Sequence, residues 1–340
     1  NDWLQVGIDG DGELVSVFDK TTGRQILKDG RKGNRLKLQE DIPVEWGSAW
    51  EVTTKREDKA PFPFTGTSQC IKEHNDLYTV LSVRKSVHHS SVEQDIIMYH
   101  HAPLMEFRTR VDWDERQKML RVEFPADIHT LTARYDIAFG NVEHPNHSTT
   151  SYDEARFEVC GHKWGDISDG SHGAALMNDC KYGYTIQDSD MVLSLLRSAD
   201  FPSDSCDKGV HTFSYWFYPH DGGIKEGRVA QAGYEANVPL LVQAGKAARD
   251  EHSYIHTNCD NIVIDTVKKS EDGEEIVLRI FETYNTVNDV VLTMGFSVDS
   301  CEETDLLERH LEDLPVTDGQ IRFTIHPYEI KTYKVTCKHK

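Results

Sequence analysis

The sequence predicts an all-β protein, and three observations support this expectation. Apolar and polar residues alternate with a two-residue period over much of the chain, as in 105–111, which is typical of strands with one solvated face. Asp-Gly pairs, which favour hairpin turns, separate runs of this kind at Asp11-Gly12, Asp272-Gly273 and Asp318-Gly319. Only residues 224–236 have a composition that favours a helix. Antiparallel sheets are therefore expected throughout.

In chain order, the first hairpin is expected to join residues 4–8 to 14–18 through Asp11-Gly12. The segment 213–220, with sequence FSYWFYPH, has aromatic residues at both alternating positions and is interpreted as a strand buried on both faces. The other strands expected in this part of the chain cover 78–83, 92–99, 105–111 and 120–124.

The second half of the chain changes character after residue 223. A short helix over 224–236 is expected to stop at Asn237 and Pro239, and the small polar residues 243–252 are interpreted as a linker. Two domains follow from this pattern, over residues 1–242 and 253–340. The second is expected to be a β-sandwich with strands at 261–267, 276–282, 290–294, 321–325 and 328–335. A further cluster is interpreted either as a helical turn or as a loop packed on this sandwich: Leu306, Leu307, Leu311 and Leu314.

Charge and composition exclude some classes of partner. The 37 basic and 57 acidic residues give a net charge of −20, which opposes binding to nucleic acid or to an anionic membrane. No apolar run approaches the roughly 20 residues of a membrane span and no leader is recognised, so a cytoplasmic location is expected. The chain begins at Asn1 without a methionine, as if cut from a longer polypeptide. The seven cysteines contain no C-x-x-C pair and are expected to be buried, reduced thiols.

Residues 144–184 gather histidines, carboxylates and aromatic side chains between glycines, a combination that suits a sugar. No zinc motif of the type H-E-x-x-H occurs, so no metal site is expected, and no catalytic motif is found. A glycosidase requires two facing carboxyl groups, whereas the carboxylates here are interpreted mainly as caps of turns or as exposed groups. They are Asp153, Glu154, Asp166, Asp169 and Asp179, together with Asp188 just after the stretch. For the tryptophans before loops, Trp46, Trp50 and Trp164, core packing and stacking on a sugar ring remain open alternatives.

Several stretches, in order and spacing along nearly the whole chain, resemble the C-terminal β-rich region of glycoside hydrolase family 38 α-mannosidases. The similarity points to the cytosolic and vacuolar branch and its bacterial relatives. The stretches that carry the resemblance include GELVSVFDKTTGRQIL (12–27), EDIPVEWGSAWEV (40–52), FRTRVDWDERQKMLRVEFP (107–125), FGNVEHPNHSTTSYDEARFEVCGHKWGDIS (139–168), GAALMNDCKYGY (173–184) and HPYEIKTYKV (326–335).

The resemblance implies a large galactose-mutarotase-like supersandwich followed by a smaller β-sandwich. It also implies retaining hydrolysis of terminal α-mannosidic bonds of oligosaccharides through a covalent mannosyl-enzyme. The nucleophile, the acid/base carboxylate and the ligands of a zinc or cobalt ion are implied to lie in an N-terminal barrel and helical bundle outside this chain. This segment is then implied to close one wall of the active site, with no catalytic residue and no cofactor of its own.

Four residues are carried over as substrate-binding candidates. In the stretch MNDCK, Lys181 takes the place of a basic residue that lies near the sugar in the family, and Asp179 is its neighbour. Trp46 and Trp50 belong to a loop that faces the active site in the family. This loop is W-D-A-W in relatives and WGSAW here, so no acidic role is carried over to it.

Three alternatives belong to other functional classes. An aldose mutarotase would need a histidine acid and a glutamate base, for which His162 or His211 with Glu158 are candidates. A stand-alone carbohydrate-binding module would use the tryptophans instead. A purely structural role would be the assembly of a homo-oligomer.

Overall fold

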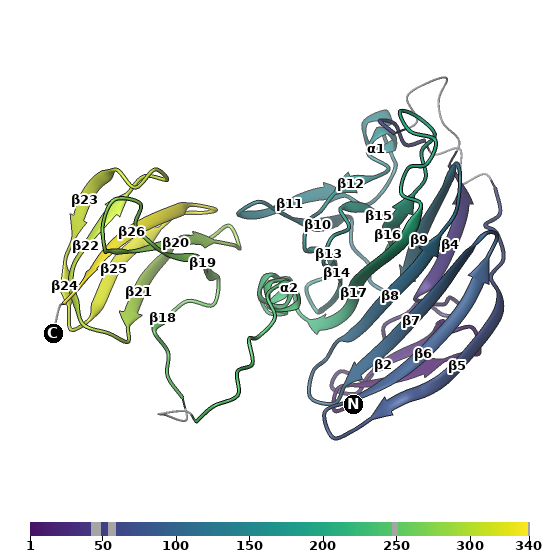
Figure 1. Cartoon of the computed structure of the whole chain (residues 1–340), viewed down its shortest axis with the longest axis horizontal. Helices are drawn as coiled ribbons and strands as arrows, with labels where there is room; N and C mark the ends of the chain where they lie inside the picture. The colour runs from purple at the N-terminus through teal and green to yellow at the C-terminus, as the bar shows by residue number, and fades with distance from the viewer. Residues whose placement is uncertain (42–48, 54–58, 247–250, 339–340) are drawn as a thin grey trace. The chain divides into compact units, whose positions relative to one another are not determined.

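The computed structural model describes residues 1–41, 49–53, 59–246 and 251–338. Strands dominate these residues, which contain two short helices, so the all-β prediction is confirmed (Figure 1). The chain packs as two compact units, one of residues 1–136 and 142–237 and one of residues 137–141 and 238–340. At the start of the segment 238–340, residues 238–246 have no regular structure, and the side chains of Leu240, Leu241 and Val242 are almost fully exposed.

The first unit begins with the hairpin that the Asp-Gly turn predicts. Strands β1 (Leu4–Ile8) and β2 (Leu14–Asp19) pair antiparallel, and β3 (Arg24–Gln25) extends the sheet beyond β2. Gly12 has a φ of 76°, and a Cβ atom there would lie 2.8 Å from Cγ1 of Val83. Only glycine satisfies both constraints, the left-handed backbone and the close contact.

Two larger sheets complete the first unit. The nine-stranded sheet has the order β11-β10-β13-β14-β17-β8-β7-β6-β5, and the five-stranded sheet has the order β12-β15-β16-β9-β4. The nine strands are β5 (Thr65–His74), β6 (Tyr78–Val87), β7 (Ser90–Tyr99), β8 (Met105–Trp113), β10 (Thr132–Ile137), β11 (Gly140–Pro145), β13 (Trp164–Ser168), β14 (His172–Asn178) and β17 (Gly209–Asp221). The five strands are β4 (Arg35–Glu40), β9 (Lys118–Pro125), β12 (Val159–Cys160), β15 (Gly183–Gln187) and β16 (Asp190–Arg197).

The two sheets pack face to face around one apolar core, because alternate residues of each strand point inward. Phe124 of the five-stranded sheet contacts three aromatic rings of the nine-stranded sheet, those of Phe107, Tyr215 and Phe217. Its ring centroid lies 5.5 Å from that of Phe107 and 4.8 Å from that of Phe217. The first unit is thus a large β-sandwich.

Helix α2 (Val229–Asn237) covers part of the outer face of the nine-stranded sheet. Its Val229 packs with Trp164 and Trp216, so β17 is buried on both faces, as its aromatic pattern predicts. The predicted helix start at 224 is wrong. Arg228 has a φ of 50°, which interrupts a right-handed helix, so the residues before it form turns. A second helix, α1 (Ser151–Ala155), was not predicted; a capping box between Thr150 and Asp153 fixes its start.

Strand β5 forms one edge of the nine-stranded sheet and pairs with β6. Most of its ten residues are exposed. The register of this pairing shifts twice, between Thr65 and Ser68 and between Ile71 and Glu73, so the edge strand is irregular.

The second unit is a smaller sandwich of a four-stranded and a five-stranded sheet with its own core, which includes Leu278, Val290, Ile321 and Tyr333. Strands appear where the alternation predicts them. The four-stranded sheet contains β18 (Ile255–Thr257), β21 (Asn288–Met294), β25 (Gln320–Ile325) and β24 (Val316–Thr317). The five-stranded sheet contains β19 (Ile262–Lys269), β20 (Ile276–Glu282), β26 (Ile330–Cys337), β22 (Val298–Thr304) and β23 (His310–Leu314).

The leucine cluster forms no helical turn, and of its four members Leu314 packs against the core of the second unit. Glu308 has a φ of 63°, and Asp305 accepts hydrogen bonds from the backbone of Leu307 and Arg309, so the segment turns and enters β23. Three of the four leucines are more than half exposed, at 58%, 73% and 59% for Leu306, Leu307 and Leu311.

The cysteines differ from expectation as well. All seven are free thiols, but only Cys301 is buried, and three are exposed, namely Cys70, Cys160 and Cys180. Cys70 and Cys160 lie in β5 and β12, which are the edge strands of their sheets. Edge strands leave more side-chain surface open to solvent, so these thiols are not buried.

Gly165 provides a test of how tightly the sandwich is packed. A Cβ atom at this position of β13 would lie 2.9 Å from Cδ1 of the fully buried Tyr184. Gly165→Ala is therefore expected to lower the free energy of unfolding of the first unit by about 1–3 kcal/mol. The control is Gly10→Ala, where no atom lies within 4 Å and the change should stay within about 0.5 kcal/mol. All six tryptophans lie in the first unit, so urea denaturation followed by tryptophan fluorescence reports on this unit alone. Equal stabilities of the two variants would contradict the prediction.

Candidate functional site

The turn between β14 and β15 holds two of the four predicted substrate-binding residues, Asp179 and Lys181. The side chain of Asn178, the last residue of β14, accepts a hydrogen bond from the backbone nitrogen of Lys181 at 2.5 Å. On the other side, the carboxylate of Asp179 accepts a hydrogen bond from the backbone nitrogen of Ser214 at 2.8 Å. These two hydrogen bonds fix the turn to β14 and to β17. The turn contains one basic residue, Lys181, and one acidic residue, Asp179.

Lys181 is half-buried, and its Nζ lies 4.5 Å from the ring centroid of Phe213, a cation–π contact that orients the ammonium group. Asp179 remains exposed at the surface. Between them, partial burial and a hydrogen bond with Asp179 raise the pKa of the Cys180 thiol to about 11, so it is protonated at neutral pH. The polar groups of this turn are therefore an ammonium, a carboxylate and a neutral thiol.

Trp50 lies on a second surface segment of the first unit, with 66% of its area exposed. Its ring centroid is 5.6 Å from that of Phe201, and the backbone of Ala49 donates a hydrogen bond to the carbonyl of Phe201. Arg197, at the end of β16, holds this segment: its guanidinium pairs with Asp41 at 2.5 Å and donates to the carbonyls of Ala49 and Glu51. Trp46 lies outside the residues that the structure describes.

Strand register places the Lys181 turn and the Trp50 segment at the same end of the five-stranded sheet. Gly183 at the start of β15 pairs with Ser194 of β16, three residues before that strand ends at Arg197. Met119 near the start of β9 pairs with Arg197. Strand β4 ends at Glu40 beside Lys118, immediately before Asp41. The turn before β15 and the segment after β4 therefore lie at the same end of the five-stranded sheet. The first holds Lys181 and the second holds Trp50.

Several of the other carboxylates of residues 144–184 are engaged in structural contacts. Asp153 caps α1, and Asp169 accepts hydrogen bonds from Ser171 and His172, so the interpretation of these two as turn caps is confirmed. Burial raises the pKa of Asp169, but these hydrogen bonds outweigh it and lower the pKa to about 2. Asp169 is therefore a cap that is ionised at neutral pH.

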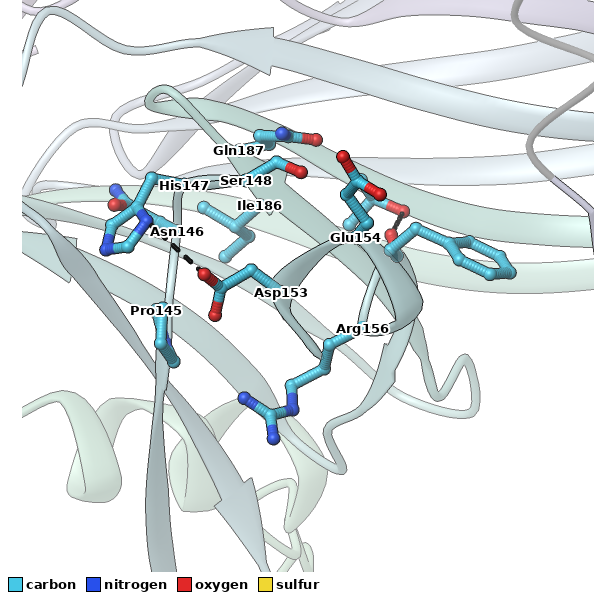
Figure 2. Close-up of a pocket in the computed structure, with 11 residues that line it drawn as sticks. Pro145, Asn146, His147, Ser148, Asp153, Glu154, Arg156, Ile186 and Gln187 are labelled. Carbon is cyan, nitrogen blue, oxygen red and sulfur yellow. Dashed lines mark hydrogen bonds and ion pairs between the residues drawn. The ribbon is translucent and has the colours of Figure 1, made fainter. Parts of the chain in front are cut away.

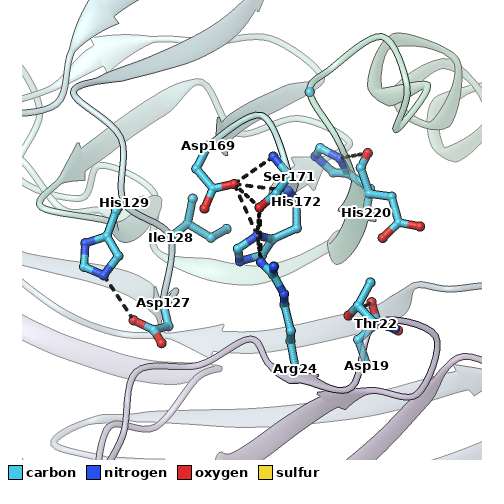
Figure 3. A network of polar contacts seen from close by, with 12 residues as sticks. Asp19, Thr22, Arg24, Asp127, Ile128, His129, Asp169, Ser171, His172 and His220 are labelled. Carbon is cyan, nitrogen blue, oxygen red and sulfur yellow. Dashed lines mark hydrogen bonds and ion pairs between the residues drawn. The ribbon is translucent and has the colours of Figure 1, made fainter.

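Figure 3 shows the polar network around Asp169 and, beside it, the buried His220. Arg24 donates to the hydroxyl of Ser171 at 3.1 Å and lies 2.5 Å from Nδ1 of His172. Asp166, by contrast, is neither exposed nor a cap. Its carboxylate lies 2.8 Å from Nε2 of His220, and the side chains of both residues are 1% exposed. The sequence did not predict this buried pair.

Burial tends to lower the pKa of His220, but attraction by the Asp166 carboxylate and its hydrogen bond raise it above the usual value. The ring lies against two glycines: a Cβ atom on Gly173 would be 2.4 Å from its Cε1, and one on Gly227 would be 2.2 Å from its Nδ1. The pair is thus a tightly enclosed, charged contact between β13 and β17.

The residues proposed for a mutarotase are engaged elsewhere. The imidazole of His211 contacts the carbonyl of Asp207 at 2.6 Å, and the ring of His162 packs against Tyr182. The carboxylate of Glu158 accepts a hydrogen bond from the hydroxyl of Ser194 at 2.9 Å. Trp164, also a candidate for sugar stacking, is 1% exposed, which favours its alternative role in the core.

Among the described residues, one group of three side chains has ligand atoms close enough together to hold a metal ion: Glu302, His310 and Asp313 of the second unit. His310 and Asp313 are exposed, and Nδ1 of His310 lies 2.6 Å from the carboxylate of Glu302. Lys334 also approaches Glu302, at 3.7 Å, and competes electrostatically with a cation. No helix of the described residues is long and apolar enough to cross a bilayer.

Comparison with known proteins supports the resemblance seen in the sequence. Residues 1–205 match the model of the glycosyl hydrolases family 38 C-terminal domain, and residues 261–333 match that of the family 38 C-terminal β-sandwich domain. Alpha-mannosidase G of Dictyostelium discoideum is 34% identical over 98% of this chain, and human alpha-mannosidase 2C1 is 33% identical over 97%.

The structure of an alpha-mannosidase from Enterococcus faecalis V583 superposes with a TM-score of 0.78 over 99% of this chain and 42% of that chain, at 18% identity, which supports the fold. The chain spans about a third of the length of the two relatives, 32% in each case. The two matched models cover both units, and the chain therefore belongs to glycosyl hydrolase family 38, of which it forms the C-terminal β-rich region.

Proposed function

We propose that this chain is the C-terminal part of a retaining α-mannosidase that removes terminal α-mannosyl residues from oligosaccharides. The observation that carries the proposal is the match of 97–98% of this chain to proteins named alpha-mannosidases, of which it covers 32%. The catalytic nucleophile and the acid/base carboxylate belong to an N-terminal barrel outside this chain.

The role proposed for this chain is that of a rigid wall of the active site. Lys181 offers a charged donor to a sugar hydroxyl, and Asp179 offers an acceptor on the same turn. Asn178 and Ser214 fix the backbone of this turn, so little conformational freedom is lost when a sugar binds. Trp50 and Trp46 supply aromatic surface for a sugar ring, and the exposure of Trp50 leaves room for such stacking.

The divalent metal ion of the family is proposed to bind outside this chain. A catalytic ion needs an enclosed site with oriented ligands and an open position for substrate. The Glu302, His310 and Asp313 group does not fit this requirement, because two of its three side chains are exposed and Lys334 lies beside it. In the parent enzyme the ion would polarise and orient the sugar, and the role of this chain is to complete the pocket.

The free thiols support a cytoplasmic location for the parent enzyme. All seven cysteines are unpaired, although three are exposed, a state typical of a reducing compartment. Fractionation of cells that express the full-length protein would test this assignment, and recovery in a secreted fraction would contradict it.

The direct test of the proposed role is Lys181→Ala in the full-length enzyme. Its kcat/KM on an aryl α-mannoside is expected to fall about 10- to 100-fold, because a hydrogen bond from a charged donor contributes about 1.5–3 kcal/mol. The matched control is Lys269→Ala, which removes an exposed lysine from the second unit and should leave kcat/KM unchanged. The 340-residue chain alone should show no turnover with added zinc or cobalt. Turnover by this chain, or an unaffected Lys181→Ala enzyme, would contradict the proposal.

A further inference from the structure

The loop that follows β11 contains the triplet Asn146-His147-Ser148, and no other triplet of the sequence has the pattern N-x-S or N-x-T with x other than proline. This pattern marks the asparagines to which N-linked glycans are attached in the secretory pathway. Because a glycan is large and strongly hydrated, an asparagine that carries one lies at the surface of the folded protein. Whether Asn146 is compatible with a glycan therefore depends on its place in the fold.

Asn146 is only 2% exposed, although its neighbours in the triplet lie nearer the surface. Figure 2 shows the segment that leads from β11 to α1, with Asn146, His147 and Ser148 labelled. His147 is half-buried and Ser148 is exposed, so Asn146 is the one buried residue of the three. Its Nδ2, the atom to which a glycan would be attached, is itself buried.

The backbone of Asn146 is held on both sides by hydrogen bonds. Its nitrogen donates to the carbonyl of Leu131 at 3.0 Å, immediately before β10, and its carbonyl accepts from the nitrogen of Asp188 at 2.9 Å, in the turn between β15 and β16. Strand β10 belongs to the nine-stranded sheet, whereas β15 and β16 belong to the five-stranded sheet. A large group on Nδ2 would have to displace packed atoms or pull this backbone away from its partners in both sheets.

The chemistry of N-glycosylation makes the conflict unavoidable in the folded chain. An oligosaccharide is transferred from a lipid-linked oligosaccharyl pyrophosphate: the bond between Nδ2 and C1 of the first sugar forms, and the bond between C1 and the pyrophosphate oxygen breaks. The lipid pyrophosphate leaves as an anion, and the amide loses one proton to water. The product has a pyranose ring joined directly to an atom that the fold buries. The transfer can therefore take place only before the first unit folds, and it then opposes folding.

We infer that Asn146 is a glycan acceptor in the unfolded chain only, and that synthesis into the lumen of the endoplasmic reticulum would attach a glycan there and prevent the first unit from folding. The chain then reaches its fold only in a compartment without the transferase. This inference adds to the cytoplasmic location proposed above, but it rests on the burial of Asn146 and not on the assignment as an α-mannosidase.

The test is cell-free synthesis of the 340-residue chain, fused to a cleavable signal sequence, with microsomes and a reducing agent that keeps the seven cysteines as free thiols. Digestion with an endoglycosidase reports the glycan, and limited proteolysis after permeabilisation with detergent reports the fold. The wild type and Ser148→Thr, which keeps the triplet, should both carry a glycan. Both should be cut at least about tenfold faster than the same chain made without microsomes.

Two variants separate the glycan at Asn146 from other effects of the lumen. Ser148→Ala removes the triplet by changing an exposed side chain, and it should stay unmodified and as resistant to protease as the chain made without microsomes. Adding Val287→Thr to Ser148→Ala creates a new triplet that begins at Asn285, and both of these positions are exposed. The double variant should carry a glycan and remain resistant, because an exposed asparagine accommodates the glycan without loss of packing.

Several results would overturn the inference. They are an unmodified wild type, a glycosylated wild type that resists protease as well as Ser148→Ala does, and a Ser148→Ala chain that also fails to fold in microsomes. A protease-sensitive double variant would overturn it too, since a glycan at any position would then have the same effect.

The already folded chain provides the complementary measurement. Chain purified after cytoplasmic expression and added to permeabilised microsomes should stay unmodified, and a glycan on it would show that Asn146 is accessible in the fold. Fractionation of cells tests the cytoplasmic location of the parent enzyme separately, and its kinetic assay tests the proposed function, so each can fail without the others.

Discussion

Replacing His220 by alanine is expected to lower the free energy of unfolding of the first unit by about 3–5 kcal/mol, the cost of leaving one member of a buried ion pair without its partner. Both side chains of the His220–Asp166 pair are 1% exposed, so water cannot replace the lost contact. Urea denaturation followed by tryptophan fluorescence measures the change, because all six tryptophans lie in this unit.

The control for this prediction is His101→Ala. His101 pairs with Asp2 at the same distance of 2.8 Å, but the two side chains are 67% and 60% exposed, so the change should stay below about 1 kcal/mol. If His220→Ala changed the free energy of unfolding as little as His101→Ala does, the ion pair with Asp166 would contribute little to stability beyond its packing.

The same pair predicts a dependence on pH with a definite sign. Burial opposes protonation of His220, but Asp166 and, more weakly, the neighbouring Asp221 raise its pKa above the usual 6.5. The stabilisation from the charged ring is therefore complete below about pH 6.5 and is lost as pH rises through the raised pKa of the folded state. The stability difference between wild type and His220→Ala should shrink over that range, and a difference that grows with pH would contradict the assignment.

Replacing Asn178 by alanine is expected to cost about 2–4 kcal/mol and to impair the Lys181 turn. Its amide donates to the hydroxyl of Tyr184 at 2.6 Å and to the carbonyl of His162 at 2.8 Å, and its oxygen accepts from the backbone of Lys181. Asn178 is 1% exposed, so alanine leaves several buried polar groups unpaired and a small cavity. Denaturation by urea measures the loss of stability.

The control is Asn75→Ala. Asn75 also fixes a turn, by accepting hydrogen bonds from the backbone of Leu77 and Tyr78, but it is only partly buried and should cost about 1 kcal/mol. In the full-length enzyme, Asn178→Ala should reduce kcat/KM, and the double variant with Lys181→Ala should be little worse than Lys181→Ala alone. Fully additive losses would mean that Asn178 acts independently of Lys181.

The strands that the sequence predicted are found because side-chain alternation is local, whereas others, such as β5, β14 and β16, were not predicted. The hairpin at Gly12 follows from its turn dipeptide, and the aromatic run of β17 predicts a strand buried on both faces. The errors arise where a single backbone conformation decides the outcome. Arg228 and Glu308 both adopt positive φ values, which no pattern of hydrophobic residues reveals.

The candidate site was predicted less completely, for a different reason. The resemblance provided Lys181 and Asp179, but the residues that fix them come from elsewhere in the chain. Ser214 bonds to Asp179 across 35 positions, and Arg197 reaches the segment of Trp50 across nearly 150. The buried pair of Asp166 and His220 is 54 residues apart, so only the fold brings the two side chains together.

The irregular edge strand β5 has a consequence for how the large sheet behaves in a crowded solution. An exposed, regular edge of ten residues would offer its free backbone groups to another chain, as in amyloid growth. The two register shifts displace those groups from a straight ladder, and Lys72, paired with Asp95, adds a charge that a docking strand would have to desolvate. The widest sheet of the molecule thereby ends in a strand that a foreign strand cannot easily extend.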